Sequence, residues 1–201
     1  MSRIVVTEFM SLDGVIEDPR WTFQFDRGSE GDKFKFDELF ASDALLLGRV
    51  TYQGFAQAWP NMAEDNGEFG IRMNSIPKYV VSATLADAEA NWGDTTVIRE
   101  DAVAEIARLK AQADGDLLVE GSGQLVHALS QHGLVDEYRL MVFPIVLGAG
   151  QRLFPDVLSQ PALLTLTEAR TAGGGVLLLR YQPAATQPPA AGQQVTTAGR
   201  A

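Results

Sequence analysis

The chain has 201 residues, a mass of 21.8 kDa and a formal net charge of −10 at pH 7. This charge disfavours binding to nucleic acid, because phosphates attract basic surfaces. Cysteine is absent and histidine occurs only twice, which excludes disulfides and thiolate catalysis, and we expect no metal site. No apolar run has the length of a membrane span and the first residues lack the pattern of a signal peptide, so we expect a cytoplasmic protein without membrane contact.

The sequence opens with a strand and a turn. Residues 3–9 are rich in Ile and Val and predict a buried strand, and Asp13-Gly14 marks the turn after it. The polar loop that follows carries three aromatic residues, Trp21, Phe23 and Phe25. These residues favour a lid over a pocket or a subunit contact, and the alternative is simple packing at the edge of the fold.

A first helix is predicted over 32–41. Its buried face would hold Phe36, Leu39 and Phe40, which recur at helical spacing. Asp32 lies one turn before Phe36 and is therefore expected on the inward side, unless it only caps the helix.

A second strand leads into a possible anion site. The continuous apolar run 44–47 is typical of a central parallel strand covered on both faces. It runs into Gly48-Arg49-Val50-Thr51, which predicts a helix start. Helix N-termini attract anions, and Arg49 and Thr51 could add a guanidinium and a hydroxyl to a phosphate site. The alternative for Arg49 is a surface salt bridge.

The middle of the chain mostly predicts scaffold. Residues 60–75 lack periodicity and predict a loop or a ragged helix, whereas 78–81 and 97–98 predict strands. Ser82 follows the first of these strands at the edge where ligands bind in open α/β sheets. Asp101 is expected to cap a helix that ends by Gly115.

The segment 116–154 carries a βαβ pattern. Apolar residues 117–119 lead through Glu120 into Gly121-Ser122-Gly123 and a helical stretch that Gly133 ends, and 138–142 predicts the second strand. Such a turn can hold a phosphate at the helix N-terminus, although it also occurs where a helix only packs tightly on its strand. Ser122 lacks the Gly-x-Ser-x-Gly setting of a hydrolase nucleophile, so a role as phosphate ligand or cap is favoured.

The last third predicts a hairpin and a tail. Runs rich in Leu, Thr and Val at 162–169 and 176–181 flank Ala172-Gly173-Gly174-Gly175, which indicates an antiparallel hairpin. The residues that follow are mainly Pro, Ala, Gln and Gly. We therefore expect one domain over 1–182 and a disordered tail over 183–201.

Taken in order, these motifs resemble the dihydrofolate reductase-like superfamily. The closest resemblance is to the group with the C-terminal reductase domain of riboflavin biosynthesis proteins and its stand-alone bacterial relatives. The matching segments are SLDGVIE (11–17), LGRVTYQGF (47–55), MNSIPKYVVSATL (73–85), LLVEGSGQLVHAL (117–129), GLVDEYRL (133–140) and PIVLGAGQRLF (144–154).

The resemblance implies a three-layer α/β/α domain with a mostly parallel sheet and an antiparallel C-terminal hairpin. It also implies a nicotinamide cofactor, NADPH in most of the family. By position, the cofactor residues would be Gly48, Arg49, Thr51, Ser82, Gly121, Ser122, Gly123, Gln124 and Leu125. Asp13, Gly14 and Glu120 would face the cleft where substrate meets nicotinamide, and Trp21 of the loop would contact substrate.

The resemblance does not extend to a folate site. Folate reductases carry an acid on the first helix, and Asp32 stands at about the right offset before Gly48, but its neighbours do not match. The implied activities are therefore those of a reductase resembling 5-amino-6-(5-phosphoribosylamino)uracil reductase or dihydrofolate reductase, with the substrate left open.

Two functions remain. The first is an NADPH-dependent reductase that transfers a hydride to a small pyrimidine-, pterin- or carbonyl-type substrate, with Asp13 as the leading polar catalyst and Glu120 and Asp32 behind it. Each acid has a structural alternative, as turn former, partner of a scaffold cation and helix cap respectively. The second function is a non-catalytic, dimeric nucleotide-binding or regulatory module. A homodimer is expected because Met141 to Leu147 is apolar beyond what the βαβ unit needs and because relatives commonly pair.

Overall fold

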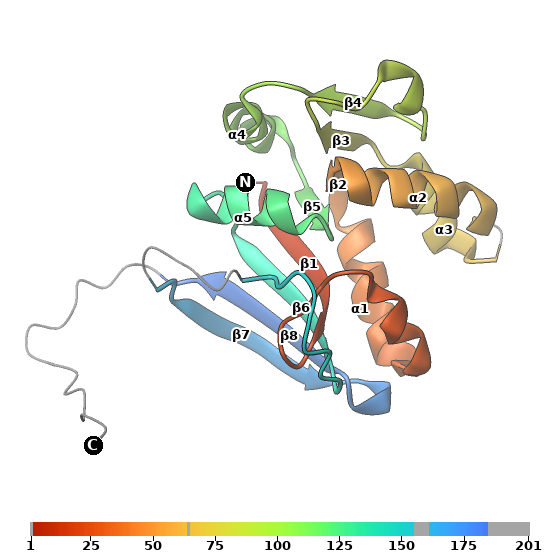
Figure 1. The fold of residues 1–201 in the computed structure, drawn as a ribbon, viewed down its shortest axis with the longest axis vertical. Helices are drawn as coiled ribbons and strands as arrows, with labels where there is room; N and C mark the ends of the chain where they lie inside the picture. The colour runs from red at the N-terminus through yellow and green to blue at the C-terminus, as the bar shows by residue number, and fades with distance from the viewer. Residues whose placement is uncertain (1, 64, 155–160, 185–201) are drawn as a thin grey trace, which may run out of the picture.

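Eight strands form one continuous sheet in the computed structural model, which describes residues 2–63, 65–154 and 161–184 (Figure 1). Their order is β4-β3-β2-β5-β1-β6-β8-β7. All neighbours from β4 to β6 pair in parallel, whereas β8 pairs antiparallel with β6 and β7, which confirms the C-terminal hairpin. The strands are β1 (Ile4–Ser11), β2 (Ser42–Gly48), β3 (Lys78–Val81), β4 (Thr95–Ile98), β5 (Asp116–Glu120), β6 (Glu137–Phe143), β7 (Leu164–Thr171) and β8 (Leu177–Pro183).

Helices cover both faces of the sheet (Figure 1). On one face, α1 (Gly28–Phe40), α2 (Arg49–Met62) and α3 (Gly67–Ser75) bury Leu39, Tyr52 and Met73 against the sheet. On the other face, α4 (Ala102–Gln112) and α5 (Gly123–Gln131) bury Ile106 and Leu125. The strands between them are apolar on both sides, as expected of covered parallel strands. The three-layer α/β/α prediction is confirmed.

The predicted βαβ unit is present, but its two strands are not neighbours. Strands β5 and β6 are parallel and β1 lies between them. Helix α5 ends as predicted at Gly133, which has φ +64. The N–H of Leu134 then donates to the carbonyl of Leu129 at 3.0 Å, the closing bond of a left-handed helix cap.

Residues 60–75 are more regular than predicted. Helix α2 continues to Met62 and accommodates Pro60 in its last turn, and α3 occupies 67–75. Helix α3 buries only Gly70 and Met73, so its apolar pattern is too sparse to reveal a helix in the sequence. Asp101 takes the N-cap position of α4 with φ 44, but its side chain makes no capping hydrogen bond.

The predicted face of α1 is partly wrong. The helix begins at Gly28 and buries Phe34, Lys35, Glu38 and Leu39, whereas Phe40 is exposed. The prediction placed aromatic residues on the inward face because buried charged residues are rare. The observed inward face nevertheless includes a lysine and a glutamate.

The hairpin extends slightly past the predicted domain boundary. Strand β8 includes Pro183, and the N–H of Ala184 donates to the carbonyl of Leu163 at 2.9 Å. The rest of the predicted tail, 185–201, lies outside the described residues.

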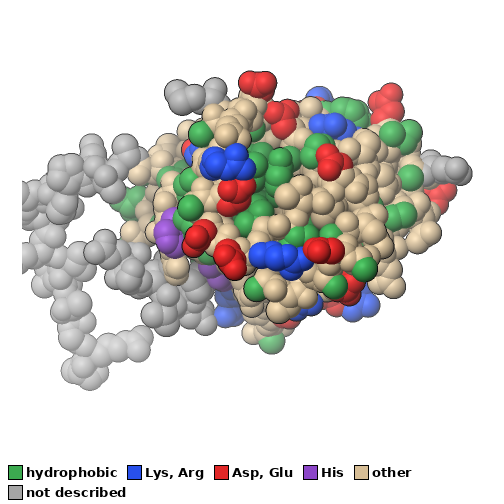
Figure 2. Space-filling view, turned by 90° about the horizontal axis from the view of Figure 1, so that it is seen from above, with side chains coloured by type: hydrophobic (Ala, Val, Ile, Leu, Met, Phe, Trp, Pro, Cys, Tyr) green, Lys and Arg blue, Asp and Glu red, His purple; other side chains and the backbone are tan. Residues whose placement is uncertain are grey.

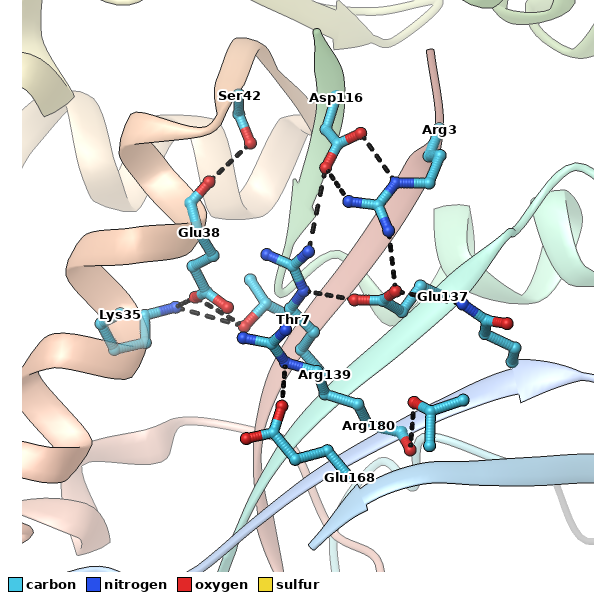
Figure 3. Close-up of polar contacts among 12 residues, drawn as sticks. Arg3, Thr7, Lys35, Glu38, Ser42, Asp116, Glu137, Arg139, Glu168 and Arg180 are labelled. Carbon is cyan, nitrogen blue, oxygen red and sulfur yellow. Dashed lines mark hydrogen bonds and ion pairs between the residues drawn. The ribbon is translucent and has the colours of Figure 1, made fainter. Parts of the chain in front are cut away.

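Ion pairs tie together the starts of three parallel strands (Figure 3). The guanidinium of Arg3 donates to Asp116 at 2.6 Å and to Glu137 at 2.9 Å, which are the first residues of β5 and β6. Arg139 donates to Glu137 at 2.6 Å. Because these strands run in parallel, their amino ends lie together and are joined by this network. Their carboxyl ends lie together at the opposite end of the sheet.

Candidate functional site

The two predicted glycine turns meet at the carboxyl ends of neighbouring strands. The N–H of Gly48, the last residue of β2, donates to Oγ of Ser122 at 2.9 Å. The N–H of Ser122 donates to Oγ1 of Thr51 at 3.1 Å, and its hydroxyl donates to the carbonyl of Glu120 at 3.1 Å. The starts of α2 and α5 are therefore joined directly.

Ser122 is a tie between the turns and does not cap α5 with its side chain. A hydroxyl has one proton, and that of Ser122 is already donated to Glu120. By contrast, Thr51 only accepts within this site, so its hydroxyl proton is available to an anion.

The backbone of the second turn requires glycine. Gly121 has φ +58, and a Cβ there would lie 3.2 Å from both Cγ2 and Oγ1 of Thr51. Ser122 is also left-handed, at φ 64. The N–H groups of Leu125 and Val126 bond to the carbonyl of Ser122, and buried Leu125 anchors the helix on the sheet.

The first N–H groups of α5 have no hydrogen-bond partner within the described ranges, although Ile16 and Gln151 lie over Gly123. These are the N–H groups of Gly123 and Gln124. Free N–H groups at a helix N-terminus, next to a glycine that permits close approach, fit a phosphate.

Arg49 adds a cation at this edge. Its side chain is exposed and donates to Oε1 of Gln53 at 3.0 Å. Among the residues that the structure describes, Arg49 has no ion-pair partner, so the surface salt bridge considered as its alternative is not formed. An unpaired guanidinium beside two helix starts fits an anionic group.

Ser82 lies on the same edge of the sheet. Val81 is in register with Gly48, so Ser82 follows beside the start of α2. Its Oγ accepts the N–H groups of Thr84 at 3.1 Å and Leu85 at 2.9 Å and so shapes the turn after β3. Its hydroxyl proton is not used in these bonds.

Asp13 clamps two loops together. Its carboxylate accepts the hydroxyl of Ser11 at 2.7 Å and the N–H groups of Leu147 at 3.1 Å and Gly148 at 2.8 Å. These bonds lower the pKa of Asp13 to about 2, and the bond from Leu147 has the largest effect on the pKa. Asp13 is therefore a fixed carboxylate at neutral pH and has no proton to donate.

The predicted substrate residues Gly14 and Trp21 have structural roles. Gly14, at φ +86, donates its N–H to the carbonyl of Ser11 at 3.0 Å. Trp21 donates its ring N–H to the carbonyl of Glu17 and packs edge-on against Phe143, with ring centroids 5.5 Å apart. Phe25 also packs on Phe143, whereas Phe23 is 85% exposed. Edge packing, the alternative to a lid, describes Trp21 and Phe25.

The inward placement predicted for Asp32 is wrong. Its carboxylate is exposed and pairs with Nε of Arg27 at 2.7 Å. The helix begins one turn earlier than predicted, and its inward face is that of Lys35 and Glu38.

The sequence interpretation missed a charged cluster around Glu120. Nζ of Lys35 lies 2.7 Å from Oε1 of Glu120 and 3.3 Å from Oγ1 of Thr7, and it also pairs with Glu38. Thr7 donates to Glu38 at 2.8 Å (Figure 3). Burial opposes the charge of Lys35, but Glu120 and Glu38 outweigh it and raise the pKa of Lys35. The alternative for Glu120, pairing with a scaffold cation, is thus observed.

The described residues include neither a metal-binding cluster nor a helix that could span a membrane. Within 2–63, 65–154 and 161–184 there is no group of three His, Cys, Asp or Glu residues that could hold a metal, and no helix has the length and apolar content of a membrane span. Nε2 of His127 donates to the carbonyl of Leu153 at 2.6 Å. Figure 2 shows acidic and basic side chains interspersed over one face, so an anionic ligand depends on local groups.

The contact between Gly121 and Thr51 can be tested with a matched glycine. Gly121→Ala should destabilise the protein more than Gly133→Ala, because both sites are left-handed but only Gly121 has atoms within 4 Å of the new Cβ. The left-handed backbone alone costs about 1–2 kcal/mol. Urea unfolding of both variants measures the difference, and equal losses would show that the Thr51 contact relaxes at no cost.

The clamp at Asp13 makes stability depend on pH. Because the pKa of Asp13 is lowered in the folded state, its contribution is present above the ordinary value of 3.8 and is lost as pH falls toward about 2. Asp13→Asn should therefore unfold at a lower temperature than the parent at pH 7, and the gap should shrink between pH 4 and pH 2. A gap independent of pH would contradict the clamp.

The sequence matches a known protein family and a curated bacterial protein. The family model for the RibD C-terminal domain matches residues 2–178. The Bacillus subtilis (strain 168) protein named "Uncharacterized protein YyaP" is 29% identical over 185 residues, which cover 89% of this chain and 94% of that protein.

Solved structures show the same fold. A putative riboflavin biosynthesis protein from Shewanella sp. PV-4 superposes with a TM-score of 0.72 at 22% identity, covering 92% of this chain and all of that one. A diaminohydroxyphosphoribosylaminopyrimidine deaminase/5-amino-6-(5-phosphoribosylamino)uracil reductase from Thermotoga maritima has a TM-score of 0.64 at 14% identity, covering 91% of this chain and 57% of that one. The sheet order and the hairpin are those of the dihydrofolate reductase-like fold, and the chain belongs to the RibD C-terminal domain family.

Proposed function

We propose that this protein is an NADPH-dependent reductase that transfers a hydride to a small pyrimidine-, pterin- or carbonyl-type substrate. The observation that carries the proposal is the convergence of two glycine-gated helix starts, tied through Ser122 to Gly48 and Thr51, beside the unpaired cation of Arg49. Membership of a reductase-type domain family supports a nicotinamide cofactor.

The donor groups divide naturally between two phosphates. The N–H groups of Gly123 and Gln124 would hold the pyrophosphate, while the guanidinium of Arg49 and the hydroxyl of Thr51 would hold a phosphate at the start of α2. Ser82 could add its hydroxyl at the next strand end. When bound, NADPH supplies the hydride, so the chain needs only to orient the reactants and exclude water.

Glu120 is the acid that we propose to orient the substrate. It ends β5 next to the glycine turn, retains 17% exposure of its side chain, and is held by Lys35 at 2.7 Å. Asp13 is committed to the loop clamp, and Asp32 is turned outward. A carboxylate held by a buried lysine keeps a fixed position.

The placement of the acids also favours the second candidate, a non-catalytic nucleotide-binding or regulatory module. None of Asp13, Glu120 and Asp32 is a free carboxyl beside the glycine turns. A panel of unsaturated pterins, pyrimidines and carbonyl compounds separates the candidates. Oxidation of NADPH by any of them supports the reductase, whereas tight NADPH binding without oxidation across the panel supports the module.

We also propose a homodimer, but with the interface on the outermost hairpin and not on the stretch from Met141 to Leu147. Met141 and Phe143 are buried within the chain's own sheet, so they are not available to a partner, and only Pro144 and Val146 in this stretch are exposed. Exposed Leu163, Leu166 and Leu177 instead lie on or beside the outermost hairpin. Light scattering should give about twice the chain mass at micromolar concentration, and Leu166→Lys should lower it. A monomer mass for the parent would end the proposal.

Arg49 provides the direct test of the cofactor site. Calorimetric titration of Arg49→Ala should show NADPH binding about tenfold weaker, because a charge-assisted phosphate contact is lost, with a smaller change for NADH. Arg170→Ala is the matched control, since Arg170 lies on β7, away from the glycine turns, and pairs with Glu30 and Glu168. Equal losses for NADPH and NADH would show that Arg49 does not bind the additional phosphate.

A further inference from the structure

One buried carboxyl beside the glycine turn has no partner for one of its oxygens. Glu8 on the central strand β1 is only 5% exposed, and its Oε1 makes no hydrogen bond with any described residue. An unsatisfied buried oxygen is costly, so it marks either a defect or a position that a ligand completes.

The register of the sheet places Glu8 beside the predicted phosphate turn. Thr7 pairs with Glu120, so the next residue along β1 lies level with Gly121. Side chains alternate along a strand, and Val6 and Met10 belong to the core that includes Leu125 of α5. Glu8 therefore projects on the α5 side of the sheet, opposite Thr7 and the Lys35 cluster.

The carboxyl of Glu8 favours its protonated form. Burial raises its pKa well above the ordinary value, and the charge of Glu120 raises it further, although Lys35 opposes both. A protonated carboxyl offers one donor and one acceptor, which matches a primary amide.

The order of the strands suggests how a bound dinucleotide would be oriented along the carboxyl ends of the sheet. With phosphates at β2 and β5, one end extends past β3 and β4 and the other past β1. A hollow of about 420 Å³ lies between β4 and α4, and its lining combines apolar Val97, Ile98 and Ala104 with charged residues of both signs. The bulky adenosine would lie on that side, so the nicotinamide would reach β1 one strand spacing beyond β5.

We propose, on the basis of the proposed function, that the Glu8 carboxyl docks the carboxamide of the nicotinamide ring. Its unpartnered Oε1 accepts an N–H from the carboxamide, and this contact fixes which face of the ring is turned to the substrate. Ile16 and Gln151 lie over Gly123 from two loops, so movement of these side chains admits the ring.

Two ligands separate the nicotinamide contact from the phosphate contacts. NADPH carries the carboxamide, whereas 2′-phospho-ADP-ribose has the same adenosine and phosphates without the nicotinamide. Glu8→Met should bind NADPH about tenfold more weakly and 2′-phospho-ADP-ribose with unchanged affinity, because one buried hydrogen bond is lost. Glu8→Gln should stay within about threefold of the parent for both ligands, since its amide also offers a donor and an acceptor.

Glu38→Gln is the matched control, because Glu38 is an equally buried glutamate with an unpartnered oxygen on the opposite side of β1. It should not change the ratio of the two affinities. Equal weakening of both ligands by Glu8→Met, or no weakening of either, would overturn the role of Glu8. Failure of the parent to bind either ligand would instead overturn the proposed function.

A measurement on the parent protein covers the case in which Glu8→Met does not fold. The oxidised analogue with an acetyl group in place of the carboxamide keeps the carbonyl and lacks the N–H. The parent should bind it about tenfold more weakly than NADP⁺, and Glu8→Gln should retain this discrimination. Equal affinity of the parent for the two compounds would rule the contact out.

Discussion

The site depends on the hydrogen bonds of Ser122, which join the end of β2 to the turn after β5. Gly48 donates to its hydroxyl at 2.9 Å, and its own N–H donates to Thr51 at 3.1 Å. The positive ends of α2 and α5 are therefore held at one point, where both partial charges would act on the cofactor phosphates that we propose. Glycine at position 121 is the steric condition for this arrangement, since a Cβ would meet Thr51 at 3.2 Å. Helix starts on separate, mobile loops would bind an anion with a larger loss of entropy.

Charge in this acidic protein is distributed so that attraction for anions is local. Two buried cations are matched by carboxylates: Lys35 lies between Glu38 and Glu120, and Arg139 pairs with Glu137 at the opposite ends of the strands. Arg49 has no such partner among the described residues. The surface as a whole repels anions at a net charge of −10. The proposed cofactor binding would therefore rely on short-range contacts at the helix starts, which salt screens less than a broad surface potential.

The sequence was sufficient for the architecture and for the glycine turns, because both follow from local patterns. Apolar runs mark covered strands, and Gly48 and Gly121 mark abrupt passages from strand to helix. The acids were harder to place, because the orientation of a carboxylate depends on tertiary partners. Asp13 is used by Leu147 and Gly148, distant in sequence, and Asp32 is turned outward by the phase of α1. Lys35 and Glu8 could have been found from one signal, a charged residue within an otherwise buried pattern.

Part of the cost carried by this fold lies near the same site. Glu8 and Glu38 each leave a buried oxygen without a partner, and each such group costs about 1–3 kcal/mol. Ser122 adopts a left-handed backbone that costs a non-glycine residue about 1–2 kcal/mol. Glu8 and Ser122 lie beside the Thr7–Glu120 pair in the sheet register, and Glu38 accepts the hydroxyl of Thr7. The unpartnered Oγ of Ser2 and the left-handed Asp18 and Asp101 lie elsewhere. Strain and unmet hydrogen bonds persist where a ligand relieves them. The position of Glu8 and Ser122 at the turn after β5 thus supports the ligand contact that we propose there, without reference to any relative.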